Sequence, residues 1–125
     1  MISLFFGLVF AAGHLNQEVR DYEGDLLNGI RTSAVVFGCR RTFLASLFTF
    51  TAAYAILGDL AALGILPRLL LGCTVLWFLH VAWSLRALQH GLGFETAVWM
   101  QRRYRLLFAF IGLAMLVSST RWFVT

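Results

Sequence analysis

The chain has 125 residues, of which 60% are hydrophobic and 13% charged, and its mean hydropathy is +0.80. Soluble domains are about half apolar and about a quarter charged, so this composition excludes an ordinary soluble domain and predicts an integral membrane protein. The net charge of +4 rests on arginines, with no lysine, and these are spread between apolar runs without a basic, aromatic-interleaved patch, so no nucleic-acid partner is predicted.

The first segment, MISLFFGLVFAAGHL, is apolar and runs directly into an acidic stretch. Its length and the small residues AAG are typical of a signal peptide, but no lysine or arginine precedes the apolar run, as a signal sequence normally requires. We therefore predict a short or incomplete transmembrane helix from Ile2 to about Asp25. A loop with Gly29 and Gly38 as helix breakers follows it.

Three later runs contain no charged residue, namely residues 42–58, 69–85 and 106–120. Each approaches the roughly 17–25 residues that cross a bilayer, because flanking arginine side chains can extend to the interface. Together they predict three further helices, at about residues 41–57, 68–89 and 104–123. Asp59, Gly64 and Pro67 mark the turn between the second and third helices.

The segment HGLGFETAVWMQRRYR, between the third and fourth predicted helices, is expected at the membrane interface. Gly91 and Gly93 break the helix there, and Trp99 and Tyr104 suit the headgroup layer. The predicted fold is all-α: a multi-pass transmembrane bundle of about four helices that forms a single domain over residues 1–125.

The arginines indicate the orientation of this bundle. Four lie between the first and second apolar segments: Arg20, Arg31, Arg40 and Arg41. Four more lie between the third and fourth: Arg86, Arg102, Arg103 and Arg105. Between the second and third segments there is Arg68 alone. By the positive-inside rule, the first and third connections are expected in the cytoplasm and the Pro67 turn outside, which puts a motif loop at residues 18–41 on the cytoplasmic side.

Four of the six acidic residues gather in EVRDYEGDLLNG, residues 18–29. On a helix, His14, Glu18, Asp21 and Asp25 share one face, because they are four, three and four positions apart. Like charges at this spacing repel each other by about 0.2–0.5 kcal/mol per pair, so helix stability does not explain them. A Mg²⁺ ion would reverse that repulsion, since it takes oxygen ligands from one or two carboxylates, water and substrate phosphate.

With Arg20 and Arg31 nearby, the carboxylates indicate a diphosphate held through Mg²⁺, in which arginine contacts the remaining phosphate oxygens. The alternative is that the acidic residues are a solvated cap or docking loop on a small, non-enzymatic integral membrane subunit. A third hypothesis starts from His80, an ionisable residue inside a membrane segment. Together with His14 it would ligate a haem, whereas the simpler role is a neutral histidine hydrogen-bonded across helices.

Aromatic and cysteine residues of the apolar segments add weaker indications. Trp77, Phe78 and Trp83 either line a tunnel for a prenyl chain, where aromatic faces stabilise a cation, or face lipid and neighbouring helices. Cys39 and Cys73 are expected to be small buried residues without a disulfide between them.

Residues 16–38, NQEVRDYEGDLLNGIRTSAVVFG, resemble the second aspartate-rich motif of the UbiA superfamily of intramembrane prenyltransferases. The family pattern is Asp-x-x-x-Asp, a glycine four residues later, a threonine, and a short apolar run that ends in glycine. Its positions are matched by Asp21, Asp25, Gly29, Thr32 and Gly38. Three further membrane helices after the motif match the C-terminal half of that all-helical fold.

This resemblance implies a Mg²⁺-dependent transfer of a prenyl group from a prenyl diphosphate to a lipophilic acceptor in the membrane. Carried onto this chain, it implies Asp21 and Asp25 as Mg²⁺ ligands and Glu18 as a possible third. It also implies Arg20 and Arg31 as diphosphate contacts.

The chain departs from the family pattern in one respect. The first motif, of the Asn-Asp-x-x-Asp type, does not occur in it. We therefore expect the chain alone to be inactive, as a truncated gene product, one piece of a split enzyme or a fragment of a longer chain whose N-terminal half is missing. The acceptor and the prenyl chain length do not follow from the sequence.

Overall fold

Helices account for nearly all of residues 1–120, the part of the chain that this computed structural model describes. In chain order they are α1 (Ile2–Leu27), α2 (Ser33–Phe37), α3 (Cys39–Ala62), the 3-10 helix η1 (Arg68–Val75), α4 (Leu76–His90) and α5 (Phe94–Thr120). No strand occurs between residues 1 and 120, and the prediction of an all-α bundle is confirmed.

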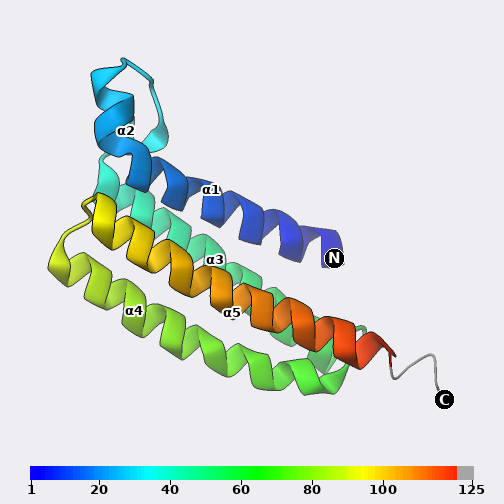
Figure 1. Cartoon of the computed structure of the whole chain (residues 1–125). Helices are drawn as coiled ribbons and strands as arrows, with labels where there is room; N and C mark the ends of the chain where they lie inside the picture. The colour runs from blue at the N-terminus through cyan, green and yellow to red at the C-terminus, as the bar shows by residue number, and fades with distance from the viewer. Residues whose placement is uncertain (121–125) are drawn as a thin grey trace.

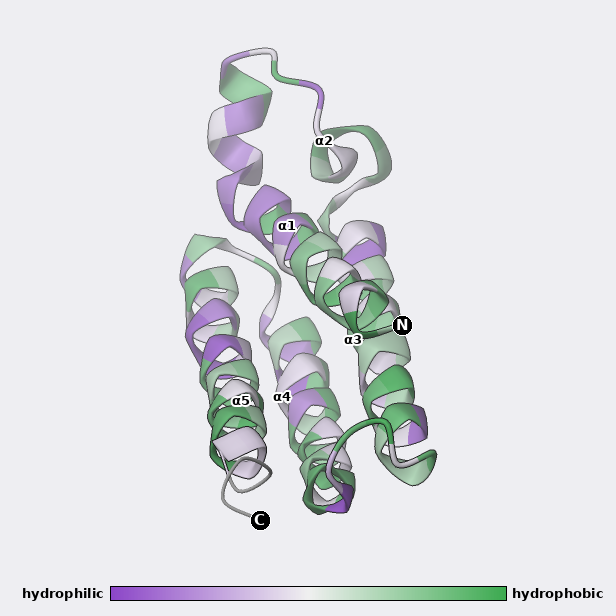
Figure 2. Cartoon of the chain, turned by 90° about the vertical axis from the view of Figure 1, so that its right-hand side faces the viewer, coloured by the Kyte–Doolittle hydropathy of each residue, from purple (hydrophilic) through white to green (hydrophobic). Residues whose placement is uncertain are grey.

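Three segments are long and apolar enough to cross a membrane: Cys39–Ala62, Arg68–His90 and Phe94–Thr120. Helix α1 is the fourth long helix, but its apolar residues fill only its first half. Figure 2 shows the hydrophilic turns of α1 and α5 lying toward the same end of the bundle, near α2. The multi-pass membrane architecture is therefore confirmed, with α1 packed against the spans.

The connections between the helices lie at two opposite ends of the bundle (Figure 1). The segment from α1 through α2 to α3 lies at the same end as the α4–α5 connection, and we call this the motif end. The N-terminus and the connection from α3 to η1 lie at the opposite end. The arginine distribution predicted that the first and third connections share a side. That this side faces the cytoplasm remains a prediction.

Helix α5 corrects the sequence-based expectation for the last span. The prediction that this helix begins at about Tyr104 is wrong, because α5 begins at Phe94. Gly91, with φ of 82°, ends α4 in a conformation that glycine favours, and the Gly93 carbonyl accepts the amide of Ala97 at 3.0 Å. The interfacial segment is thus mostly helix, packed by buried side chains such as Gln101. The predicted end near Phe123 lies outside the described residues.

Two shorter segments also differ from expectation. The third span begins as a 3-10 helix after Pro67, and the Thr74 hydroxyl donates to the Leu71 carbonyl at 2.6 Å within it. The motif loop contains the unpredicted helix α2, whose N-terminus is capped by the Thr32 side chain. Gly38, with φ of 90°, separates α2 from α3.

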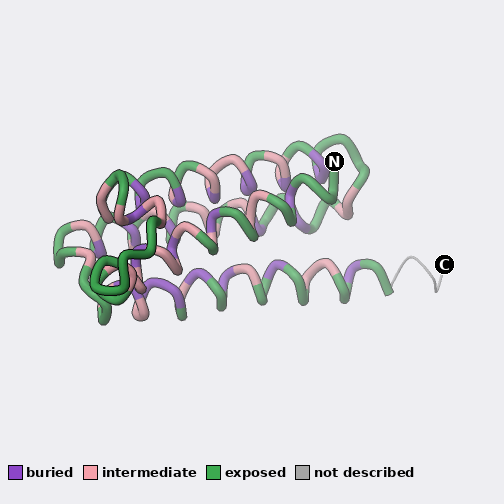
Figure 3. The backbone as a smooth tube through the Cα atoms, turned by 90° about the horizontal axis from the view of Figure 1, so that it is seen from above, coloured by how far each residue is buried: buried purple, intermediate pink, exposed green. Residues whose placement is uncertain are grey.

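Aromatic rings from α3, α4 and α5 form the centre of the bundle. The Phe50 ring is fully buried, and its centroid lies 4.7 Å from that of His80, 4.9 Å from that of Tyr104 and 5.1 Å from that of Phe108. The Tyr54 hydroxyl lies 3.5 Å from Nδ1 of His80. Buried positions recur along the helices (Figure 3), so this centre ties α3, α4 and α5 together. His80 therefore has the cross-helix contact that the simpler prediction gave it.

A polar contact fixes α1 on α3. The amide of Asn16 donates to the hydroxyl of Ser46, and that hydroxyl donates to the Ala12 carbonyl at 2.7 Å. All three residues are buried. Because buried polar groups are costly unless they are paired, this contact specifies one register of α1 along α3 and so fixes the position of the acidic turns that follow.

Candidate functional site

The last turns of α1 border a cavity of about 410 Å³, which we call the acidic cavity. Its lining comes from α1, the residue that follows α1, and the first residue of α5: Arg20, Asp21, Glu23, Gly24, Asp25, Asn28 and Phe94. Two of the three predicted metal ligands and one of the two predicted diphosphate contacts share this cavity. The start of α5 therefore borders the motif at Phe94.

Arg20 is bound to its neighbour and to α5. Its Nε and Nη2 atoms each donate to a carboxylate oxygen of Asp21 at 2.7 Å, and Nη1 donates to Oε1 of Gln101 at 3.1 Å. These hydrogen bonds hold the pKa of Asp21 below its ordinary value and raise the pKa of Arg20. The stabilising contribution of the pair is thus present above the ordinary carboxyl pKa and is lost as the pH falls through the lowered one.

Asp25 lies one helical turn beyond Asp21 and is half-buried. Within residues 1–120, its carboxylate has no hydrogen bond or ion pair, so its oxygens are free to accept a ligand. The backbone around it is fixed, because its carbonyl accepts the amide of Ile30 at 2.8 Å where α1 ends. Gly29, with φ of 68°, makes this turn in the conformation that favours glycine.

Glu18 and Arg31 lie outside the lining of the acidic cavity. One Glu18 oxygen accepts the amides of Ser33 at 2.6 Å and Ala34 at 3.4 Å, which fixes the start of α2, and the other lies 3.3 Å from Nε2 of His14. Arg31 is exposed in the loop before α2. The roles of Glu18 as a third metal ligand and of Arg31 as a diphosphate contact remain predictions.

The donor set of the acidic cavity fits Mg²⁺ better than a metal that needs an all-protein site. Among residues 1–120, no three histidine, cysteine or acidic side chains come together closely enough to hold a metal ion. Mg²⁺ is commonly held by one or two carboxylates, with water and substrate phosphate as the other ligands. Asp21 and Asp25 supply that number of carboxylates.

Sequence reasoning missed Gln101 and Phe94, both on the part of α5 assigned to the interface. Gln101 holds Arg20, and Phe94 borders the acidic cavity. A signal was present, because Ala97, Gln101 and Tyr104 follow a helical spacing that continues into the apolar span, and all three are buried.

The aromatic candidates occupy different surroundings. The Trp77 indole donates to the Thr51 hydroxyl at 3.0 Å, and both Trp77 and Phe78 border a shallow cavity between α3 and α4. Trp83 instead lies beneath the guanidinium of Arg103, 5.5 Å from the ring centroid. Cys39 and Cys73 are free thiols; Cys73 is buried, as the sequence predicted, whereas Cys39 is only half-buried.

Replacing Glu18 with alanine should release the start of α2. The first amides of a helix have no partner within the helix, and Glu18 supplies one for both Ser33 and Ala34. We expect hydrogen exchange at these two amides to become roughly tenfold faster, the equivalent of one hydrogen bond to a charged group. Glu23→Ala, which removes an exposed carboxylate of the same helix, is the control. Equal exchange in both variants would contradict the contact.

The fold and this site together define a multi-pass, all-α membrane protein with paired carboxylates and an arginine at one end of its bundle. The sequence model of the UbiA prenyltransferase family matches residues 1–100, and the chain therefore belongs to that family. The family implies prenyltransferase activity in general. Neither the curated proteins nor the solved structures gave a significant match.

Proposed function

We propose that this chain supplies the part of a Mg²⁺-dependent prenyltransferase that carries the second aspartate-rich motif, its C-terminal part. The enzyme would move a prenyl group from a prenyl diphosphate to a lipophilic acceptor in the membrane. The observation that carries the proposal is the acidic cavity, in which Asp21 and Asp25 stand one turn apart beside Arg20 and the Asp25 carboxylate has no hydrogen bond or ion pair among residues 1–120. Membership of the family supports the reaction class.

In this proposal, Asp21 and Asp25 would hold Mg²⁺, whereas Glu18, the third ligand of the sequence prediction, is engaged by the amides of Ser33 and Ala34. When bound, Mg²⁺ would supply positive charge that stabilises the departing diphosphate. Arg20 exchanges its contact with Asp21 for phosphate oxygens, and Arg31 contacts the diphosphate from the loop before α2. Arginine suits this task because its planar group donates two parallel hydrogen bonds to phosphate.

During transfer, the bond between the allylic carbon and the diphosphate oxygen breaks, and its electron pair leaves with the diphosphate. The acceptor donates an electron pair to that carbon and releases a proton. The apolar helices limit the access of water, which would otherwise react with the electron-poor carbon. We further propose that helices bearing the first aspartate-rich motif complete the site, and that the chain alone is inactive without them.

The test is binding of farnesyl diphosphate to the purified full chain in detergent. Calorimetry measures this binding first in the presence of MgCl₂ and then in the presence of EDTA. The proposal expects binding that requires Mg²⁺ and that inorganic diphosphate displaces. Heat release that EDTA does not change, or none at all, would reject the acidic cavity as a diphosphate site.

The runner-up function is a non-enzymatic membrane subunit that docks a partner through the motif loop. It is favoured by the exposed apolar side chains of Leu27, Ile30 and Phe37 beside the acidic residues. Absence of Mg²⁺-dependent binding, together with copurification of one defined membrane protein that Phe37→Ser releases, would favour this function over the first.

A further inference from the structure

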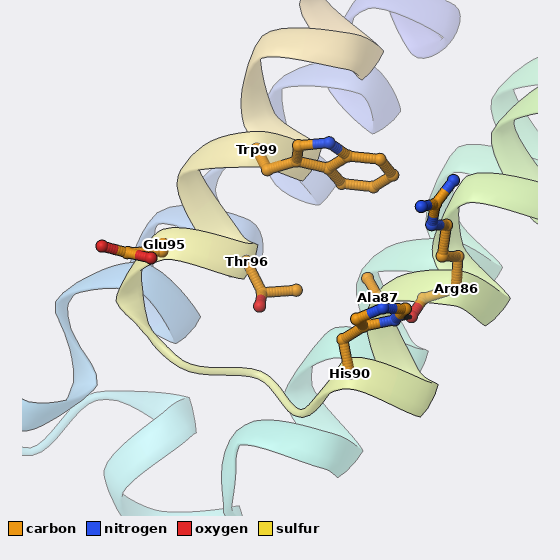
Figure 4. A pocket seen from close by; sticks show the side chains of 6 residues that line it. All are labelled: Arg86, Ala87, His90, Glu95, Thr96 and Trp99. Carbon is orange, nitrogen blue, oxygen red and sulfur yellow. Dashed lines mark hydrogen bonds between the residues drawn. The ribbon is translucent and has the colours of Figure 1, made fainter.

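The α4–α5 hairpin contains a second cavity at the motif end, of about 230 Å³, which we call the hairpin cavity. It is lined by Arg86, Ala87, His90, Glu95, Thr96 and Trp99, and it shares none of these residues with the acidic cavity. In Figure 4, the Trp99 ring and the Arg86 side chain extend toward one another from α5 and α4. The Glu95 carboxylate points away from both.

The hairpin cavity lies at the boundary of the apolar layer. The uncharged run of residues 69–85 ends directly before Arg86, so the cavity begins where α4 leaves the hydrocarbon. Tryptophan is enriched at this level of membrane proteins, and Trp99 lies opposite Arg86. The phosphates of phospholipids are concentrated in the same layer.

Arg86 and His90 are exposed at this cavity and Trp99 is half-buried, and their polar groups have few protein partners. Within residues 1–120, the Arg86 guanidinium forms no ion pair or hydrogen bond, and neither does the indole N–H of Trp99. His90 donates from Nδ1 to the Arg86 carbonyl at 2.9 Å, which leaves its Nε2 without a partner in the same part of the chain. Three nitrogen-bearing side chains thus border one cavity, and the Glu95 carboxylate that also lines it forms no ion pair with Arg86 in the described part of the chain.

A second guanidinium adds positive charge at this point. Arg103 lies 3.9 Å from the centroid of the Trp99 ring, and Arg86 lies 5.9 Å from the same centroid. The ring attracts both cations, but no carboxylate within the described residues pairs with either. The Arg103 Nε atom is buried and also lacks a hydrogen-bond partner. An anion beside the ring would relieve the repulsion between the two cations.

We propose that the hairpin cavity binds the headgroup of an anionic phospholipid, with phosphatidylglycerol as its simplest representative. Arg86 donates to the phosphate, the Trp99 N–H donates to a headgroup oxygen, and Nε2 of His90 accepts a headgroup hydroxyl. Basic pockets between membrane helices are suited to such headgroups, because the attraction to anionic lipids adds to the insertion of the acyl chains. The site is independent of prenyl transfer.

The experiment compares thermal unfolding of the purified full chain in detergent with phosphatidylglycerol, with phosphatidylcholine and with inorganic phosphate. We expect phosphatidylglycerol to raise the Tm by about 5 °C more than phosphatidylcholine, from stabilisation by a ligand in excess over its Kd. Equal shifts with the two lipids would overturn the proposal. A Tm shift with inorganic phosphate as large as that with phosphatidylglycerol would assign the cavity to a soluble anion. It would overturn the proposal that the cavity binds a lipid headgroup.

The variants locate the effect. Arg86→Gln should remove the difference between the two lipids, whereas Arg102→Gln should keep it, since Arg102 is an exposed arginine of the same hairpin that does not line the cavity. His90→Gln retains Arg86 and should reduce the difference in Tm shift between the two lipids by about half. This variant provides a second test if Arg86→Gln does not fold. Identical lipid responses in Arg86→Gln and Arg102→Gln, or an unchanged response in His90→Gln, would overturn the assignment.

Discussion

Replacing Asp25 with asparagine should weaken Mg²⁺-dependent binding of farnesyl diphosphate by at least about 100-fold. Even residues that only orient metal ligands commonly cost about 10–100-fold in affinity when changed, and Asp25 is proposed as a direct ligand. Asparagine keeps the shape of the side chain but removes the charge that attracts the ion. The Asp25 carboxylate forms no hydrogen bond or ion pair within residues 1–120 that this change would break, so the stability of the helix should be preserved. Calorimetry across a Mg²⁺ series measures the effect.

Two further variants make this result interpretable. Asp59→Asn removes a carboxylate near the opposite end of α3 and should leave binding unchanged. Asp21→Asn should also weaken binding, but it releases Arg20 from its neighbour at the same time, so its effect combines two causes. If Asp25→Asn and Asp59→Asn bound equally well, the assignment of Asp25 to the metal would be wrong.

The second large effect concerns stability. Replacing Phe50 with alanine should lower the free energy of unfolding by about 3 kcal/mol, because it leaves a cavity among rings that cannot collapse into it. Phe50 is 0% exposed and packs against His80, Tyr104 and Phe108 from two other helices. Inside a membrane bundle, the loss of dispersion contacts is the main cost. Unfolding by SDS titration measures it.

Phe48→Ala is the matched control, since it makes the same change two residues earlier on α3, where the ring is 76% exposed. Its effect should stay within about 0.5 kcal/mol, as is usual for changes away from packed contacts. Equal losses in the two variants would show that the aromatic centre is not what holds α3, α4 and α5 together.

Arg20 connects the structural and the chemical roles of the motif. By pairing with Asp21, it offsets the repulsion between Asp21 and Asp25 in the absence of a metal ion. Through Gln101 it also holds the acidic turns of α1 against α5. In the proposed reaction, Mg²⁺ would take over the first task and leave the guanidinium available for phosphate.

The candidate metal ligands could be proposed from the sequence because they lie close together along the chain. Asp21 and Asp25 are four positions apart, so a single helix places them on one face whatever surrounds it. The three apolar spans follow from the same kind of local information. Runs without charge and of sufficient length predict a membrane helix, because the bilayer requires both.

Contacts between distant segments were beyond this reasoning. Arg20 and Gln101 are separated by most of the chain, and no sequence pattern around either residue predicts its contact with the other. Gly91, Gly93 and Trp99 indicated an interfacial segment, but the packing of Ala97, Gln101 and Tyr104 against the bundle accompanies a helix that begins at Phe94. Tertiary packing outweighs the local preference there.

The sequence by itself therefore determined the class of fold, the family motif and the paired carboxylates, since each depends on residues within a few turns of one another. The tertiary structure decided which groups remain available for a ligand. Glu18 is engaged at the start of α2 and Arg20 is held between Asp21 and Gln101, whereas Asp25 keeps a carboxylate without a partner in the described chain. This distinction depends on how the helices are packed, because a side chain's partners lie on other turns and other helices.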